Sequence, residues 1–87
     1  MKISGRQVAA ARDLLGISQA ELADAVGVVR ETVERFENGR AEPYARTLEK
    51  IRTELEKRGI DFINGDGPGV RINLARAAEA ARSRSAQ

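Results

Sequence analysis

The fold is decided by one stretch, Leu15–Gly39, which reads LGISQAELADAVGVVRETVERFENG. Ser18 stands three residues before Glu21, which is the spacing of a capping box, so a helix is expected to begin there. Gly27 interrupts this helix, and a second helical pattern follows over Val29–Glu37 until an Asn-Gly pair stops it. The stretch therefore predicts two short helices joined by a tight turn.

The residues around this turn suit two helices that cross at a steep angle. Such a pair needs a small residue where the helices meet, a residue without a side-chain clash in the turn, and an apolar anchor on the second helix. Ala23, Gly27 and Val33 stand at these positions. Val26 and Phe36 are expected to add the buried contacts that hold the pair to the core.

A further helix is predicted on each side of this pair. Ser4–Leu15 has amphipathic spacing and is ended by Gly16. A later helix is expected to begin at Pro43, since proline suits a first helical turn, and to close at Gly59. The apolar positions are Val8, Ala11, Leu14 and Leu15 in the former helix and Leu48, Ile51 and Leu55 in the latter.

Beyond Gly59 the apolar residues alternate with polar ones, on both sides of the glycine-rich loop Gly65–Gly69. This predicts a β-hairpin over residues 59–74, with apolar positions at Ile60, Phe62, Val70, Ile72 and Leu74. The loop has no following helix and no Lys-Ser/Thr pair, so it is expected to be a turn rather than a phosphate-binding loop. Residues 75–87 are expected to be a weakly ordered Ala/Arg/Ser tail, which forms at most a weak helix with a frayed end.

Composition limits the classes of function. The chain has 87 residues, of which 41% are hydrophobic, enough for one compact core. It has no cysteine and no histidine, so neither an enzyme nor a metal or other cofactor is expected. No secretion signal or membrane-spanning run is visible, which predicts a cytoplasmic protein without a membrane partner. The net charge of +2 is by itself weak support for nucleic-acid binding.

The stretch Leu15–Gly39 resembles the helix-turn-helix of the phage-repressor family, the Cro and lambda-repressor-like domains also called Xre-type. The resemblance covers roughly residues 4–58 and is carried by Leu15-Gly16, Ser18–Ala23, Gly27 and Phe36–Gly39. It implies a mainly α fold of four or five packed helices over residues 1–58, with the C-terminal β-hairpin outside the shared core. It also implies sequence-specific binding of double-stranded DNA, usually as a homodimer, with the helix after Gly27 in the major groove.

By this resemblance, the helix after Gly27 faces the base edges. Arg30 is expected to bind guanine through two hydrogen bonds, and Glu31 to accept one from a cytosine amino group. Arg35, one turn further on, is within reach of a base or a phosphate. Glu34 is expected to point away from DNA, or to pair with Arg30 or a base, because a carboxylate near phosphate costs energy.

Val29 departs from the family, which usually has a capping Ser or Thr at this position. The missing cap costs about 1 kcal/mol of helix stability. Two interpretations stay open: Val29 places its methyl groups against a thymine methyl, or it merely packs at the turn. Val29 is counted with Arg30, Glu31 and Arg35 among the base-reading residues.

Other polar residues are expected to bind phosphates or to hold the scaffold. The predicted phosphate contacts are Gln19, Asn38, Arg40, Arg46 and Lys50, and the alternative is that these residues are only caps and solvated surface. Arg12 and Glu37 match a partly buried ion pair of the family, which ties the reading helix to the scaffold and is not a DNA contact. Glu42 and Tyr44 depart from the basic loop of some relatives, which weakens the case for a phosphate clamp there.

The apolar side chains of the hairpin are expected to pack against another surface, because two strands alone are barely stable. We favour pairing with a second chain across a two-fold axis, which sets two reading helices about 34 Å apart; the alternative is a hairpin that extends its own core. The predicted dimer contacts are Ile60, Phe62, Val70 and Ile72. A solvated tail is expected for Arg76, Arg82 and Arg84, with contact to the DNA backbone as the alternative.

These predictions lead to a transcription regulator, a repressor that binds an inverted-repeat operator as a homodimer. The alternative function is an antitoxin-like or adaptor module whose main partner is another protein, with DNA binding secondary or absent. An unpaired apolar face on the hairpin would favour that alternative. An enzyme is disfavoured because no paired carboxylate cluster offsets the lack of His and Cys.

Overall fold

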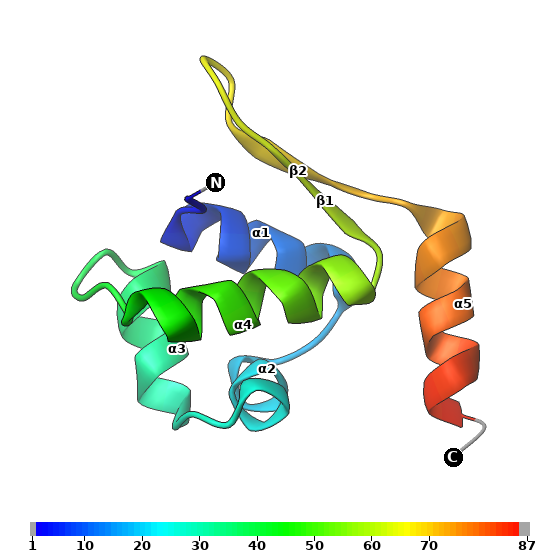
Figure 1. Ribbon diagram of the computed structural model, residues 1–87, viewed down its shortest axis with the longest axis horizontal. Coiled ribbons are helices and arrows are strands. Elements are labelled where there is room, and N and C mark those ends of the chain that lie inside the picture. The colour runs from blue at the N-terminus through cyan, green and yellow to red at the C-terminus, as the bar shows by residue number, and fades with distance from the viewer. Residues whose placement is uncertain (1, 86–87) are drawn as a thin grey trace.

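The structure is a computed structural model that describes residues 2–85. In this part of the chain, five helices and one two-stranded antiparallel sheet follow one another, with the hairpin between α4 and α5 (Figure 1). The bounds are Gly5–Leu15 for α1, Gln19–Val26 for α2, Arg30–Glu37 for α3, Ala45–Lys57 for α4, Ile60–Ile63 for β1, Gly69–Ile72 for β2 and Leu74–Ser85 for α5. The predicted mainly α fold with a hairpin near its C-terminal end is confirmed.

The helices α2 and α3 form the predicted pair and cross steeply (Figure 1). The Ser18 hydroxyl accepts a hydrogen bond from the Glu21 backbone N–H, and the Glu21 carboxylate accepts one from the Ser18 backbone N–H. This capping box fixes where α2 begins. Gly27 ends α2 with φ of 77°, in the left-handed region that favours glycine. Ala23 and Val33 are both buried where the helices meet.

The core is formed by apolar side chains from the first four helices, from β1 and from the segment before α1. Its buried members are Ile3, Val8, Ala11, Leu22, Ala23, Val26, Val33, Phe36, Ile51, Leu55 and Ile60. Leu14, predicted as part of the apolar face of α1, is 47% exposed instead. It lies about 120° around the helix from Val8, outside the stripe that faces the core.

The helix α4 begins two residues later than predicted. Tyr44 still has an extended backbone, with ψ of 151°, so the helical conformation starts at Ala45 and Pro43 lies outside the helix. Ile51 and Leu55 are fully buried, as their spacing predicted. The helix therefore packs on the core by the predicted face and starts after a short extended segment.

The hairpin packs on the helices of its own chain. Ile60 lies opposite Ile72 and Phe62 opposite Val70. Ile60 has no exposed surface, and the other three side chains pack against the core. Phe62, Val70 and Ile72 keep part of their surface exposed, so the dimer contact predicted for these four residues stays a prediction. The alternative, in which the hairpin extends its own core, describes the structure.

Gln7 in α1 binds both strands of this hairpin at the end next to its loop. Its side-chain nitrogen donates hydrogen bonds to the carbonyl oxygens of Ile63 and Gly69, at 3.0 and 3.1 Å. Its side-chain oxygen accepts a hydrogen bond of 2.9 Å from the backbone N–H of Ser4, the N-cap residue of α1. Gln7 is 5% exposed, so a buried amide joins the start of α1 to both strands.

The segment predicted as a weak tail is a helix, α5, which stands beside the end of α4 (Figure 1). Leu74, predicted as a strand position, is its first residue. The guanidinium of Arg76 donates hydrogen bonds to the backbone oxygens of Glu56 and Ile60 and to the Asp61 carboxylate. Arg76 is therefore an anchor rather than a solvated end, whereas Arg82 and Arg84 stay exposed. Residues 86 and 87 of the predicted tail lie outside the described residues.

No helix within residues 2–85 is both long and apolar enough to cross a membrane.

Candidate nucleic-acid interface

The four predicted base-reading residues are all exposed at α3. Val29 is the N-cap residue, and its side chain forms no capping hydrogen bond. Its side chain is 67% exposed, against the interpretation that it merely packs at the turn. Arg30 opens the helix, and Glu31 and Arg35 follow on its exposed side.

A chain of hydrogen bonds holds Arg30 to the scaffold. Nη1 of Arg30 donates to the side-chain oxygen of Gln19 at 3.1 Å. The side-chain nitrogen of Gln19 donates to Oε1 of Glu37 at 3.0 Å. Glu37 in turn accepts two hydrogen bonds from Arg12, from Nε at 2.7 Å and from Nη2 at 2.8 Å. This series of hydrogen bonds starts at Arg12 in α1. It passes through the end of α3 and the start of α2, and it ends at Arg30 at the start of α3.

The Arg12–Glu37 pair is the buried end of this chain. The two side chains are 15% and 4% exposed, and their contact is the two-bond geometry in which arginine matches a carboxylate. The hydrogen bond to Glu37 raises the pKa of Arg12 above its ordinary value, against the opposing effect of burial. Removing one partner of such a pair leaves an unpaired charge and typically costs about 3 to 5 kcal/mol, so the pair supports the fold as well as the reading helix.

Gln19 is the first residue of α2, as predicted. Both polar atoms of its side chain are engaged, one with Arg30 and the other with Glu37. The side chain therefore orients Arg30 in this structure, and its contact with a phosphate stays a prediction.

Glu34 does not pair with Arg30 in the structure. Its carboxylate is placed 3.4 Å from the side-chain nitrogen of Asn38, a long hydrogen bond one turn further along the helix. Asn38 is the C-cap residue of α3 and is exposed. The phosphate contact predicted for Asn38 is not tested by this arrangement.

The predicted basic phosphate contacts are exposed. No ion pair within residues 2–85 involves Arg35, Arg40, Arg46 or Lys50. Arg46 and Lys50 line a groove between α4 and the end of α2. Arg46 also lies beside Tyr44 and Thr47, near the reading helix, whereas Lys50 is about 6 Å further along α4. Arg46 is thus the better placed of the two.

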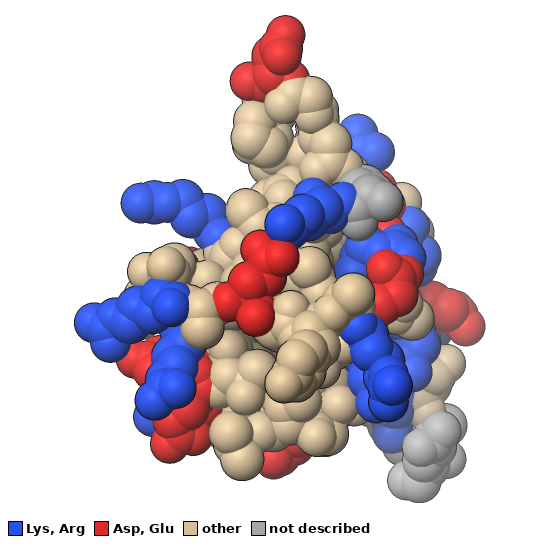
Figure 2. All heavy atoms as spheres, turned by 60° about the vertical axis from the view of Figure 1, so that its left-hand side comes forward, with Lys and Arg blue, Asp and Glu red and all other residues tan. Residues whose placement is uncertain are grey.

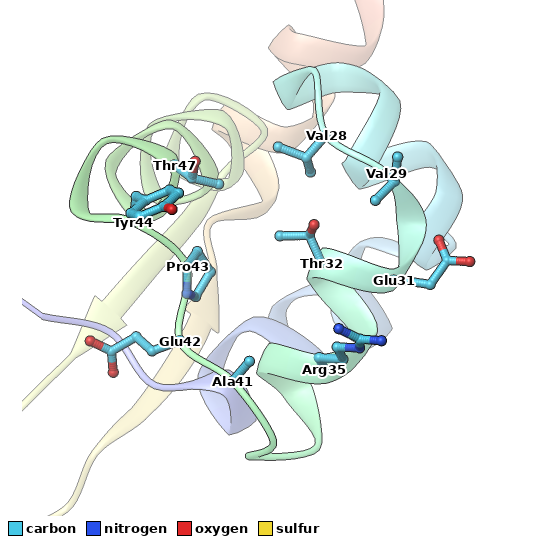
Figure 3. Close-up of a pocket in the computed structure, with 10 residues that line it drawn as sticks. All are labelled: Val28, Val29, Glu31, Thr32, Arg35, Ala41, Glu42, Pro43, Tyr44 and Thr47. Atoms are coloured by element: carbon cyan, nitrogen blue, oxygen red, sulfur yellow. The ribbon is translucent and has the colours of Figure 1, made fainter.

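A hollow of about 610 Å³ lies between α3 and the segment that leads into α4 (Figure 3). It is lined by Val28, Val29, Glu31, Thr32, Arg35, Ala41, Glu42, Pro43, Tyr44 and Thr47. Sequence reasoning missed Thr32, Tyr44 and Thr47 as candidate contacts. Tyr44 is 88% exposed, and the signal that pointed to it was its departure from the basic loop of some relatives.

The charges around this hollow are mixed. Figure 2 shows the side of the molecule that carries α3 and the start of α4, with basic side chains toward both edges and with uncharged atoms and acidic atoms between them. Carboxylates lie among the basic groups, so no continuous positive patch forms on this face. A duplex docked here would meet cations at its borders, with neutral side chains and the carboxylates of Glu31 and Glu42 between them.

The comparison with known families agrees with this geometry. A family model described as Helix-turn-helix matches residues 8–62. The chain belongs to the Xre and lambda-repressor-like helix-turn-helix family. The match covers most of α1 and all of α2, α3 and α4, which includes the whole Arg12–Glu37–Gln19–Arg30 chain of this helix-turn-helix domain. Domains of this family are DNA-binding regulatory domains. A search of curated proteins found no significant match to the chain.

Proposed function

We propose that this helix-turn-helix domain is a sequence-specific transcription regulator, a repressor that occupies an inverted-repeat operator as a homodimer. The observation that carries the proposal is Arg30, which is exposed at the first position of α3 and held by the Gln19–Glu37–Arg12 chain. An arginine fixed in this way loses less side-chain entropy when it binds a base.

Arg30 keeps most of its hydrogen-bonding capacity for DNA. A guanidinium has five N–H donors, and the bond to Gln19 uses only one of them. The remaining fork matches the two acceptors that guanine presents in the major groove. Glu31 reads a cytosine amino group, and Arg35 reaches a base or a phosphate.

The phosphate contacts position the domain and carry no sequence information. Arg40, Arg46 and Lys50 supply the positive charges, and Asn38 adds a polar contact. The residues of α3 thus contact the bases, and the polar and basic residues that follow α3 contact the phosphates of the DNA backbone.

A homodimer follows from the inverted-repeat operator, because a two-fold axis relates both the half-sites and the two chains. The inward face of the hairpin packs on its own chain, so a second copy would use the surface that Phe62, Val70 and Ile72 leave exposed or another face. An antitoxin-like or adaptor module would be favoured by an unpaired apolar hairpin face, and the packing of Ile60, Phe62, Val70 and Ile72 on the core leaves less of such a face exposed.

The experiment is selection of bound sequences from a randomised duplex pool at stated salt, with the mass measured by light scattering in the same buffer. A palindromic site and a dimeric mass are expected. Arg30→Ala and Arg35→Ala should each weaken binding to that site by about 5- to 150-fold, the range of one good base contact. The thermal midpoint should hardly change, since both side chains are exposed.

Arg82→Ala is the matched control, because it removes an exposed arginine from α5, away from α3. It should leave affinity for the site unchanged. If Arg30→Ala and Arg35→Ala bind as tightly as the unmodified protein, the reading face is assigned wrongly. If the pool yields no enriched sequence, the regulator function itself is rejected and the protein-interaction module becomes the better hypothesis.

A further inference from the structure

Two of the three asparagines in the chain are followed by glycine. The three are Asn38, Asn64 and Asn73, and the two pairs are Asn38-Gly39 and Asn64-Gly65. Asparagine is a thermally labile residue, because the backbone nitrogen of the next residue can attack its side-chain carbonyl carbon. Glycine as the next residue favours this attack, since it has no Cβ to obstruct the approach. The sequence therefore offers two places for the same reaction.

The pair Asn64-Gly65 lies in the loop between β1 and β2, which projects beyond the helices (Figure 1). Both residues are exposed, and an added Cβ at Gly65 would meet nothing within 4 Å. Within residues 2–85, no hydrogen bond involves the Asn64 side chain or the backbone N–H of Gly65. The carbon that is attacked and the nitrogen that attacks can therefore approach each other.

The pair Asn38-Gly39 is also exposed, but it is held at the end of α3. The backbone N–H of Gly39, which would have to attack, donates a hydrogen bond of 3.1 Å to the carbonyl oxygen of Phe36. The Asn38 side chain donates the long hydrogen bond to Glu34. Both groups that must meet are thus bound to other parts of the helix, so the two pairs differ in hydrogen bonding rather than in exposure.

We propose that Asn64 is a site of spontaneous deamidation, and that the end of α3 protects Asn38 from the same reaction. In the first step, the Gly65 nitrogen forms a bond to Cγ of Asn64. The side-chain amide nitrogen leaves as ammonia and takes the proton that the Gly65 nitrogen gives up, which leaves a succinimide ring. In the second step, water opens the ring: its hydroxyl group bonds to one ring carbonyl carbon, and its other hydrogen goes to the ring nitrogen as the bond between them breaks. Water is the only other reactant.

The products change the charge and the backbone of the loop. Opening at the side-chain carbonyl gives aspartate, and opening at the main-chain carbonyl gives isoaspartate, in which the backbone runs through the side chain. Either product replaces a neutral amide by a carboxylate, so the net charge falls by one unit, from +2 to +1. Gln7 binds the carbonyl oxygens of Ile63 and Gly69 on either side of the loop, so the change should stay within it. The thermal midpoint should therefore hardly change.

The test incubates the purified protein at neutral pH for several weeks and follows both asparagines by mass spectrometry of peptides after digestion. Asn64 should deamidate at least about tenfold faster than Asn38, because the hydrogen bonds at Asn38 must first break. The same incubation in urea removes the fold, and the two rates should then become similar.

Asn64→Gln is the matched control variant. It keeps a neutral amide, but its longer side chain would have to close a larger ring, which forms less readily. Ion-exchange chromatography should show a slow loss of positive charge in the unmodified protein and none in Asn64→Gln.

The inference does not depend on the proposed function. Equal rates at the two asparagines of the folded protein, or a faster reaction at Asn38, would overturn it. An Asn64 that stays intact in the folded protein, whatever happens in urea, would overturn it as well. A loss of positive charge that persists in Asn64→Gln would place the reaction elsewhere and would also reject it.

Discussion

At the scale of single residues, Gly5 is the glycine at which an added side chain would meet its neighbours most closely. Gly5 opens α1 against the end of α3, where an added Cβ would lie 1.9 Å from the carbonyl oxygen of Phe36. That oxygen belongs to the backbone and cannot move aside as a flexible side chain would. The lack of a side chain at Gly5 therefore sets how closely α1 and α3 approach.

Gly5→Ala should lower the free energy of unfolding by about 2 kcal/mol or more, although alanine is the better helix former. The measurement is urea denaturation followed by circular dichroism. Gly67→Ala is the control, because a Cβ there meets nothing within 4 Å, and its effect should stay within about 0.5 kcal/mol. Equal effects of the two changes would show that α1 and α3 are not in close contact at Gly5.

At the scale of elements, α5 is attached to the hairpin through Asp61. The Asp61 carboxylate accepts a hydrogen bond from Arg76 of α5 at 2.9 Å and one from Arg71 of β2 at 3.1 Å. The bond from Arg76, followed by that from Arg71, lowers the pKa of Asp61 below its ordinary value. A carboxylate of lowered pKa stabilises the folded state above its unfolded-state pKa, and this contribution is lost as pH falls through the folded-state pKa.

The attachment of α5 should therefore weaken in acid, from about pH 3.9, the ordinary value for aspartate, downward. Asp61→Asn should be less stable than the unmodified protein at neutral pH, and the difference should vanish at the acid end. Unfolding free energies measured across this range, with hydrogen exchange of α5 amides, check both statements. Asp66→Asn, in the exposed hairpin loop, should show no such trend. A difference that grows toward low pH would contradict the assignment.

At the scale of the whole molecule, the net charge of +2 is small, so DNA binding must depend on where the basic groups lie.

Each phosphate contact that is lost should reduce the slope of log affinity against log salt by about 0.9. Arg46→Ala should reduce the slope by this amount and should weaken all sequences alike. Filter binding at several salt concentrations measures the slope. Lys50→Ala provides the comparison, since Lys50 lies about 6 Å further along α4 and should matter less. An unchanged slope in Arg46→Ala would remove Arg46 from the phosphate contacts.

Sequence patterns predicted most of the elements because the interactions that start and stop them are local. The capping box of Ser18 and the left-handed turn at Gly27 act between residues at most a few positions apart. One local signal was missed: Ser4 and Gln7 have the same capping-box spacing, and both hydrogen bonds are present. The Arg12–Glu37 pair followed from the family resemblance, since spacing alone does not bring two residues on different helices together.

The sequence by itself thus determined the helix pair, the hairpin and the exposed start of α3, because capping groups, glycine conformation and apolar periodicity act over a few residues. Only the tertiary structure decided that the hairpin covers its own core, that Gln7 binds residues 56 and 62 positions away, and that Arg76 anchors α5. It also decided that Val29 and Tyr44 share one hollow. These contacts join segments distant in the sequence, and their partners are fixed only when the helices pack and leave particular backbone and side-chain groups within reach of one another.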